Sequence, residues 1–178
     1  MKWGLALVVM ILINGCASVR HGPDATALMA DHASWQPLAD SLAALGREVQ
    51  PGEAVWLAAC AYDCARSLAI EYHAVRPAAC QNVMVNLGLK KRGLCYHWAE
   101  DMNSRLQELN LHTLEIHWAV ARGGTWREHN SLVICARGQP FEQGIVLDAW
   151  RYAGRLYWGP VAEDRYPWRP ESDDLRSR

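Results

Sequence analysis

The chain has 178 residues, of which 51% are hydrophobic and 21% are charged, so it can bury the core of one domain and is too apolar to be disordered. Its formal net charge of −1 supplies no field that would attract an anionic polymer. We therefore expect no nucleic-acid partner, and the remaining classes are globular enzymes and binding proteins.

The first 15 residues have the composition of a secretory leader. Lys2 is followed by an apolar run at residues 3–13, which is too short for a membrane-spanning helix of about 20 residues. The segment Ile13-Asn14-Gly15-Cys16 resembles a bacterial lipobox, in which a small residue precedes a cysteine that is acylated. The resemblance implies a lipoprotein signal peptide at 1–15 and lipid attachment at Cys16.

The same resemblance implies an address. Ala17 rather than an aspartate follows the lipobox cysteine, which favours the periplasmic face of the outer membrane in a bacterial cell envelope. The membrane is then a partner through the N-terminal lipid. An ordinary signal peptide that is cut nearby is the alternative.

The rest of the chain reads as one domain at 36–170, between a tether at 16–35 and a polar tail at 171–178. Helical spacing of apolar residues in the first half predicts helices at 37–45, 52–73, 79–87 and 95–109. Pro37 is expected to open the first helix. In the second helix the core-facing stripe is expected to be Trp56, Cys60, Cys64, Leu68 and Tyr72.

The hydrophobic period changes from 3.6 to 2 in the second half of the chain, which is typical of strands. Strands are predicted at 113–120, 129–136, 144–152 and 156–161, with a tight turn at Ala153-Gly154 between the last two. Helices followed by strands predict an α+β domain, with the N-terminal helices packed on an antiparallel β meander.

Cys95 is the candidate nucleophile, because it follows a basic loop containing Gly93 and opens a predicted helix. Unpaired N–H groups and the positive end of the helix dipole favour a thiolate at such a position. The same N–H groups would stabilise an oxyanion during acyl transfer. Lys90, Lys91 and Arg92 either form a solvated loop or raise the electrostatic potential near the thiol.

His129 and Asp148 are the candidate base and its orienting group. If the hairpin around residues 137–140 is centred between Gly138 and Gln139, the numbers of paired residues add up to 277. The numbers of His129 and Asp148 also add up to 277, so the two side chains would lie opposite each other, with Cβ atoms about 4.5–5.5 Å apart. A hairpin centre two residues off would still leave them as diagonal neighbours on one face.

Three short motifs, in order, resemble the transglutaminase-like superfamily of papain-like thiol enzymes. They are Gly93-Leu94-Cys95-Tyr96-His97-Trp98-Ala99, Glu128-His129-Asn130 and Leu147-Asp148-Ala149-Trp150. The resemblance covers roughly residues 88–160. It implies a papain/transglutaminase-like core with Cys95, His129 and Asp148 as the catalytic triad. The implied chemistry is attack on a peptide or amide bond to give a thioester, with no cofactor and no metal.

Two functions from different classes remain open on this basis. The first is an envelope-anchored cysteine peptidase, amidase or acyltransferase that acts on a peptide or protein substrate. The second is a catalytically silent transglutaminase-like module that keeps the cleft to bind peptides.

The remaining cysteines have structural interpretations. Cys60, Cys64, Cys80 and Cys135 are expected to be core thiols or to include one disulfide, and no CxxC or HExxH pattern supports a zinc site among them. His97 lies two residues after Cys95 and does not share its helix face. A structural hydrogen bond is the expected role of His97, with lining of the cleft as the alternative.

Overall fold

The computed structural model describes the backbone of residues 25–171 and the side chains of residues 34–171. The predicted signal peptide at 1–15, the proposed lipid attachment at Cys16 and the tail beyond residue 171 lie outside the described residues. No helix in the described part of the chain is both long enough and apolar enough to cross a membrane.

The fold is α+β, as predicted, and residues 25–171 form four α-helices and one five-stranded antiparallel sheet. The helices are α1 (Ala25–Ala43), α2 (Pro51–Glu71), α3 (Ala78–Asn86) and α4 (Cys95–Gln107). The strands are β1 (Leu114–Ala121), β2 (His129–Ala136), β3 (Ile145–Asp148), β4 (Tyr157–Pro160) and β5 (Trp168–Pro170). Their order across the sheet is β4-β3-β2-β1-β5, so β1 to β4 form the expected meander.

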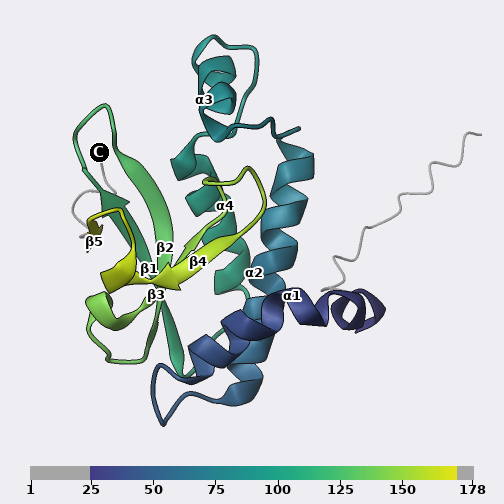
Figure 1. Cartoon of the computed structure of the whole chain (residues 1–178), viewed down its shortest axis with the longest axis vertical. Coiled ribbons are helices and arrows are strands. Elements are labelled where there is room, and N and C mark those ends of the chain that lie inside the picture. The colour runs from purple at the N-terminus through teal and green to yellow at the C-terminus, as the bar shows by residue number, and fades with distance from the viewer. Residues whose placement is uncertain (1–24, 172–178) are drawn as a thin grey trace, which may run out of the picture.

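The helices α1, α2 and α4 lie beside the sheet, and α3 projects from one end of the molecule (Figure 1). The main core fills the space between the two layers, where Leu57 of α2 and Met102 of α4 share one buried cluster with Leu132 and Leu147 of the sheet. Burial of each such side chain stabilises the fold by about 1.5–3 kcal/mol. The central strand β2 is therefore held from the helical side, which fixes its position relative to α4.

The opposite face of the sheet carries a second, smaller cluster. Val133 and Cys135 of β2, Val146 of β3 and Trp168 of β5 are buried there. Because strand side chains alternate between faces, β2 is buried on both sides along almost its whole length.

The first helix begins earlier than the sequence predicted. It spans Ala25–Ala43 with Pro37 inside it, so the expectation that Pro37 opens the helix was wrong. An internal proline removes one helical hydrogen bond. Here Trp35 and Leu38 on either side of Pro37 are buried in the main core, and their packing keeps the helix continuous through the proline.

The core-facing side of α2 also differs from the prediction. Trp56 is 40% exposed and Cys60 is only half-buried, whereas Cys64, Leu68 and Tyr72 are buried as expected. The buried face is built mostly from small residues: Ala54, Ala58, Ala59, Ala61 and Ala65. Alanines let the α2 backbone approach its neighbours closely, an option that the pattern of large apolar residues does not reveal.

The fifth strand was not predicted. Residues Trp168–Pro170 pair with the outer side of β1, and Ala121 lies opposite Trp168. The strand is too short for a period-2 pattern, and its proline suits an edge position because it has no N–H to donate. Its pairing returns the end of the described chain to the sheet and brings Trp168 to the start of β2.

Candidate active site

Cys95 is the first residue of α4, as the sequence predicted, and Leu94 before it has an extended backbone. The first N–H groups of a helix have no carbonyl partner within the helix, so those of Cys95 and Tyr96 lie at its positive end. This placement favours negative charge on sulfur and on an oxygen bound next to it.

The loop before Cys95 is held from behind by Gln81 of α3. Its side-chain amide donates to the carbonyl oxygen of Arg92 at 3.0 Å, and its Oε1 accepts from the N–H of Val75. Gly93 has φ of 128°, and a Cβ added to it would lie 2.4 Å from Nε2 of Gln81. Glycine at this position is therefore required both by the backbone conformation and by the contact.

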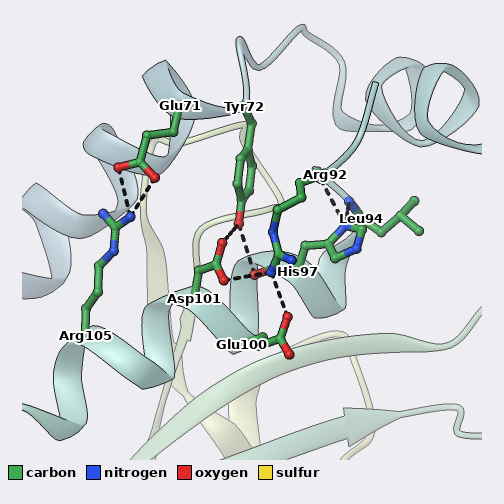
Figure 2. Close-up of polar contacts among 9 residues, drawn as sticks. Glu71, Tyr72, Arg92, Leu94, His97, Glu100, Asp101 and Arg105 are labelled. Carbon is green, nitrogen blue, oxygen red and sulfur yellow. Dashed lines mark hydrogen bonds and ion pairs between the residues drawn. The ribbon is translucent and has the colours of Figure 1, made fainter. Parts of the chain in front are cut away.

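His97 closes the same loop from the helix side. Its Nδ1 accepts hydrogen bonds from the backbone N–H of Gly93 at 3.1 Å and of Leu94 at 3.2 Å (Figure 2). Burial, together with the positive charge of Arg92, lowers the pKa of His97, so that Nδ1 stays an acceptor. The structural role expected for His97 is therefore confirmed: it caps the helix that begins at Cys95.

Arg92 of the basic loop is paired with two carboxylates of α4. The guanidinium of Arg92 donates to Glu100 at 2.6 Å and to Asp101 at 2.7 Å, and the hydroxyl of Tyr72 also donates to Asp101 (Figure 2). Lys90 donates to the backbone carbonyls of Tyr72 and His73. Of the two interpretations of this loop, the raised potential at the thiol loses the contribution of Arg92, because its guanidinium is paired with two carboxylates.

We expect Gly93→Ala to destabilise the protein by roughly 2–4 kcal/mol, because the added Cβ strains the backbone and displaces Gln81. Gly88→Ala is the matched control, since Gly88 also has a positive φ but an added Cβ there meets nothing within 4 Å. Its expected cost is about 1 kcal/mol. Urea unfolding measures both values, and equal destabilisation by the two variants would contradict the role given to the Gly93–Gln81 contact.

His129 and Asp148 meet on one face of the sheet, with Nε2 of the imidazole 2.7 Å from Oδ2 of the carboxylate. The predicted strand of His129 is confirmed at both ends, and Asp148 ends β3. The predicted register is wrong. Leu132 pairs with Leu147, so paired residue numbers add up to 279 and the two residues are diagonal neighbours. The short 3-10 helix Phe141–Gln143 lies in the β2–β3 connection and makes it asymmetric.

The imidazole–carboxylate pair is almost completely buried, with 3% of His129 and 1% of Asp148 exposed. Burial by itself lowers the pKa of His129, but the hydrogen bond to Asp148 and the nearby Cys95 outweigh it and raise this pKa to about 9. Burial likewise raises the pKa of Asp148, whereas His129 and Arg151 hold it below its usual value. Both shifts favour an imidazolium–carboxylate pair.

The pair also selects which ring nitrogen of His129 is left as the free base. An ionised carboxylate can only accept, so Nε2 of His129 carries the proton and Nδ1 is the free base in the neutral ring. Nδ1 is buried and has no hydrogen-bond partner among the described residues. Cys95 lies close enough to raise the pKa of His129, while its Sγ is 3.9 Å from the carbonyl oxygen of Glu128. The three predicted site residues are thus brought together.

Three aromatic rings enclose the imidazole of His129. Trp150 and Tyr166 each lie 4.7 Å from it between ring centroids, and Trp168 lies at 5.2 Å. Such rings exclude water, which strengthens the electrostatic interaction between the imidazole and its carboxylate. Of the three, only Trp150 belongs to a motif that the sequence singled out.

A cleft of about 490 Å³ lies beside the first turn of α4. Its lining includes Tyr96, the residue after Cys95, and also Glu128, Trp118 and Asn130. Glu100 and Glu171 complete an acidic rim, and no lysine or arginine lines the cleft among the described residues. The cleft offers a substrate an aromatic surface and carboxylates.

The other described cysteines take no part in the site. Cys60, Cys64, Cys80 and Cys135 are free thiols, and burial raises the pKa to about 11 for Cys60 and Cys135 and to about 12 for Cys64. Within the described residues, no group of three or more His, Cys, Asp or Glu side chains is placed to hold a metal ion.

Sequence reasoning missed Arg151 and Asp164. Arg151 donates from Nε to Asp148 at 2.9 Å and from a terminal nitrogen to Asp164 at 2.8 Å. The sequence contained a weak signal for the first contact, because Arg151 follows Asp148 by three residues. It contained none for the second, which depends on how the segment after β4 returns to the sheet.

Comparison of the chain with protein-family models, with curated proteins and with solved structures gives no match, so the site stands on its own geometry.

Proposed function

We propose that this protein is a thiol hydrolase or acyltransferase of transglutaminase-like type, which acts on peptide or amide bonds through Cys95, His129 and Asp148. The observation that carries the proposal is the buried imidazole between a carboxylate and a thiol. Nε2 of His129 is 2.7 Å from Oδ2 of Asp148, and Nδ1 has no hydrogen-bond partner among the described residues. Cys95 lies close enough to the same ring to raise its pKa. The start of α4 beneath the sulfur and the adjacent cleft support the same function.

The chemistry follows from these positions. Nδ1 of His129 takes the proton of the Cys95 thiol, and Sγ attacks the carbonyl carbon of the substrate. The N–H groups at the start of α4 stabilise the oxyanion. The C–N bond then breaks, the leaving amine receives the proton from Nδ1, and a thioester remains on Cys95.

The second half of the cycle releases the acyl group. Water or an amine attacks the thioester carbon while Nδ1 takes its proton. The C–S bond breaks and the sulfur leaves as a thiolate beside the imidazolium. Asp148 keeps the ring in the required tautomer throughout and stabilises its positive charge.

Capture of the thioester tests this proposal. We expect the full chain, mixed with an activated ester such as p-nitrophenyl acetate, to gain one acetyl group on Cys95 that hydroxylamine removes. Cys95→Ser and His129→Ala should not show this rapid acylation, and Cys80→Ser should show it as the wild type does. Acylation at the same slow rate in the wild type and in His129→Ala would favour the silent peptide-binding module instead.

We also propose that the protein is a lipoprotein of the bacterial cell envelope, anchored through Cys16, and that its substrates are peptides or proteins there. The support is the lipobox-like segment after a short apolar run. Cys16→Ser is expected to move the protein from the membrane fraction to the soluble fraction or to leave its leader uncut. The mass of the N-terminal peptide checks this directly: absence of an attached lipid in the wild type would rule out the anchor.

A further inference from the structure

The carboxylate of Asp148 has a second buried partner besides His129. Arg151 donates from its backbone N–H to Oδ1 at 3.0 Å and from its Nε to Oδ2 at 2.9 Å. The same guanidinium donates to Oδ2 of Asp164 at 2.8 Å. The side chain of Arg151 is 4% exposed and that of Asp164 is fully buried. One arginine therefore joins two buried carboxylates, of which one belongs to the proposed triad.

Aromatic rings fix the guanidinium in this position. It lies 3.6 Å from the ring centroid of Tyr157 and 4.9 Å from that of Tyr166. Tyr166 also packs on the imidazole of His129, and its backbone N–H donates to Asp164 at 2.8 Å. The carboxylate, the arginine and the imidazole thus share one packed set of neighbours, and none can turn without disturbing the others.

Stability alone does not account for this arrangement. A buried ion network is often no more stabilising than well-packed apolar residues of the same volume. The electrostatics do suggest a role in the site. Without a second anionic partner, the positive charge of Arg151 would weaken the attraction between Asp148 and His129. The carboxylate of Asp164, on the far side of the guanidinium, balances that charge.

We infer that Arg151 and Asp164 are positioning residues of the proposed active site. Arg151 holds Asp148 at the angle that His129 requires, and Asp164 offsets the charge of Arg151 so that Asp148 keeps its own charge for the imidazolium. This inference rests on the proposed function. Both residues act through Asp148, and neither touches the substrate or the reacting atoms.

The test follows the titration of His129 through the reactivity of Cys95. The titratable and charged groups around the ring are Asp148, Arg151, Cys95, Tyr166, Asp164, Tyr157 and Arg122. The rate of Cys95 alkylation by iodoacetamide is measured against pH in the full chain. In the wild type an upper transition, where the imidazolium loses its proton, is expected near pH 9.

Asp164→Asn removes the balancing charge and keeps the shape of the side chain. We expect its upper transition to move down by about half a unit to one unit, because the imidazolium loses part of its stabilisation. Asp164→Glu restores the charge and should bring the transition back toward the wild-type value. Asp63→Asn, at a half-exposed carboxylate on α2, is the matched control and should leave the profile unchanged. Asp164→Ser carries the same expectation if the Asn variant does not fold.

The outcomes separate this inference from the function on which it rests. If the wild type shows no upper transition and Cys95 reacts like exposed Cys80, the proposed function fails and the inference falls with it. If the wild type shows the transition and folded Asp164→Asn shows it at the same pH, the function stands. In that case Asp164 has only a structural role and the inference is overturned.

Discussion

Replacing His129 with alanine is expected to slow alkylation of Cys95 at neutral pH by about 100-fold. The physical reason is the loss of the imidazolium of His129, which lies near Cys95 and whose positive charge favours a thiolate. A factor of 100 in rate corresponds to about 2.7 kcal/mol. The start of α4 remains in the variant, so the reactivity of Cys95 should stay above that of a thiol in an unstructured peptide.

The measurement is the pH dependence of iodoacetamide labelling, with the modified cysteine identified by mass spectrometry. It is made in a Cys80→Ser background, because Cys80 is exposed. Cys60, Cys64 and Cys135 should stay silent at neutral pH, since burial raises their pKa values to about 11, about 12 and about 11. His112→Ala, at an exposed histidine, is the matched control. Equal rates in His129→Ala and the wild type would remove the basis for an ion pair at Cys95.

Asp148→Ala is expected to lower the free energy of unfolding by about 3–5 kcal/mol near pH 7. The substitution leaves the imidazole of His129 and the guanidinium of Arg151 buried without their shared partner. Asp148→Asn should cost less, because the amide oxygen can still accept one of these hydrogen bonds. Asp63→Ala is the control, and an exposed pair of this kind contributes about 0–1 kcal/mol. Urea unfolding at fixed pH gives all three values.

The same loss of stability should depend on pH in a defined direction. The pKa of His129 is raised from 6.5 to about 9 in the folded protein, so its contribution is fully present below 6.5. That contribution is lost as the pH rises through about 9. The pKa of Asp148 is lowered, so its contribution is present above the ordinary value of 3.8 and is lost as the pH falls through the folded value. The difference in the free energy of unfolding between wild type and Asp148→Ala should therefore be largest between pH 3.8 and pH 6.5. A difference that grows above pH 9 would contradict the ion pair.

The order of helices and strands, and the residues of the candidate site, could be predicted from the amino-acid sequence. The change of hydrophobic period separated the helices from the strands, because that period reflects which side chains of one element face the core. Cys95 at the start of a helix followed from the glycine-containing loop before it. The expectation that His129 and Asp148 share one face of the sheet came from strand parity, which a register change of two residues preserves and a change of one residue reverses.

The relative positions of the helices, strands and charged side chains could not be predicted, because they depend on tertiary packing. The register of β2 and β3 depended on the short helix Phe141–Gln143 in their connection, so the predicted opposite pair became a diagonal one. Arg92 forms ion pairs with two carboxylates of α4, and the composition of the loop does not reveal these pairs. Asp164 reached the site only because the chain after β4 folds back over it. In each case the residues involved lie on different elements of the chain. Packing fixes their relative positions, and a periodic sequence pattern does not encode that packing.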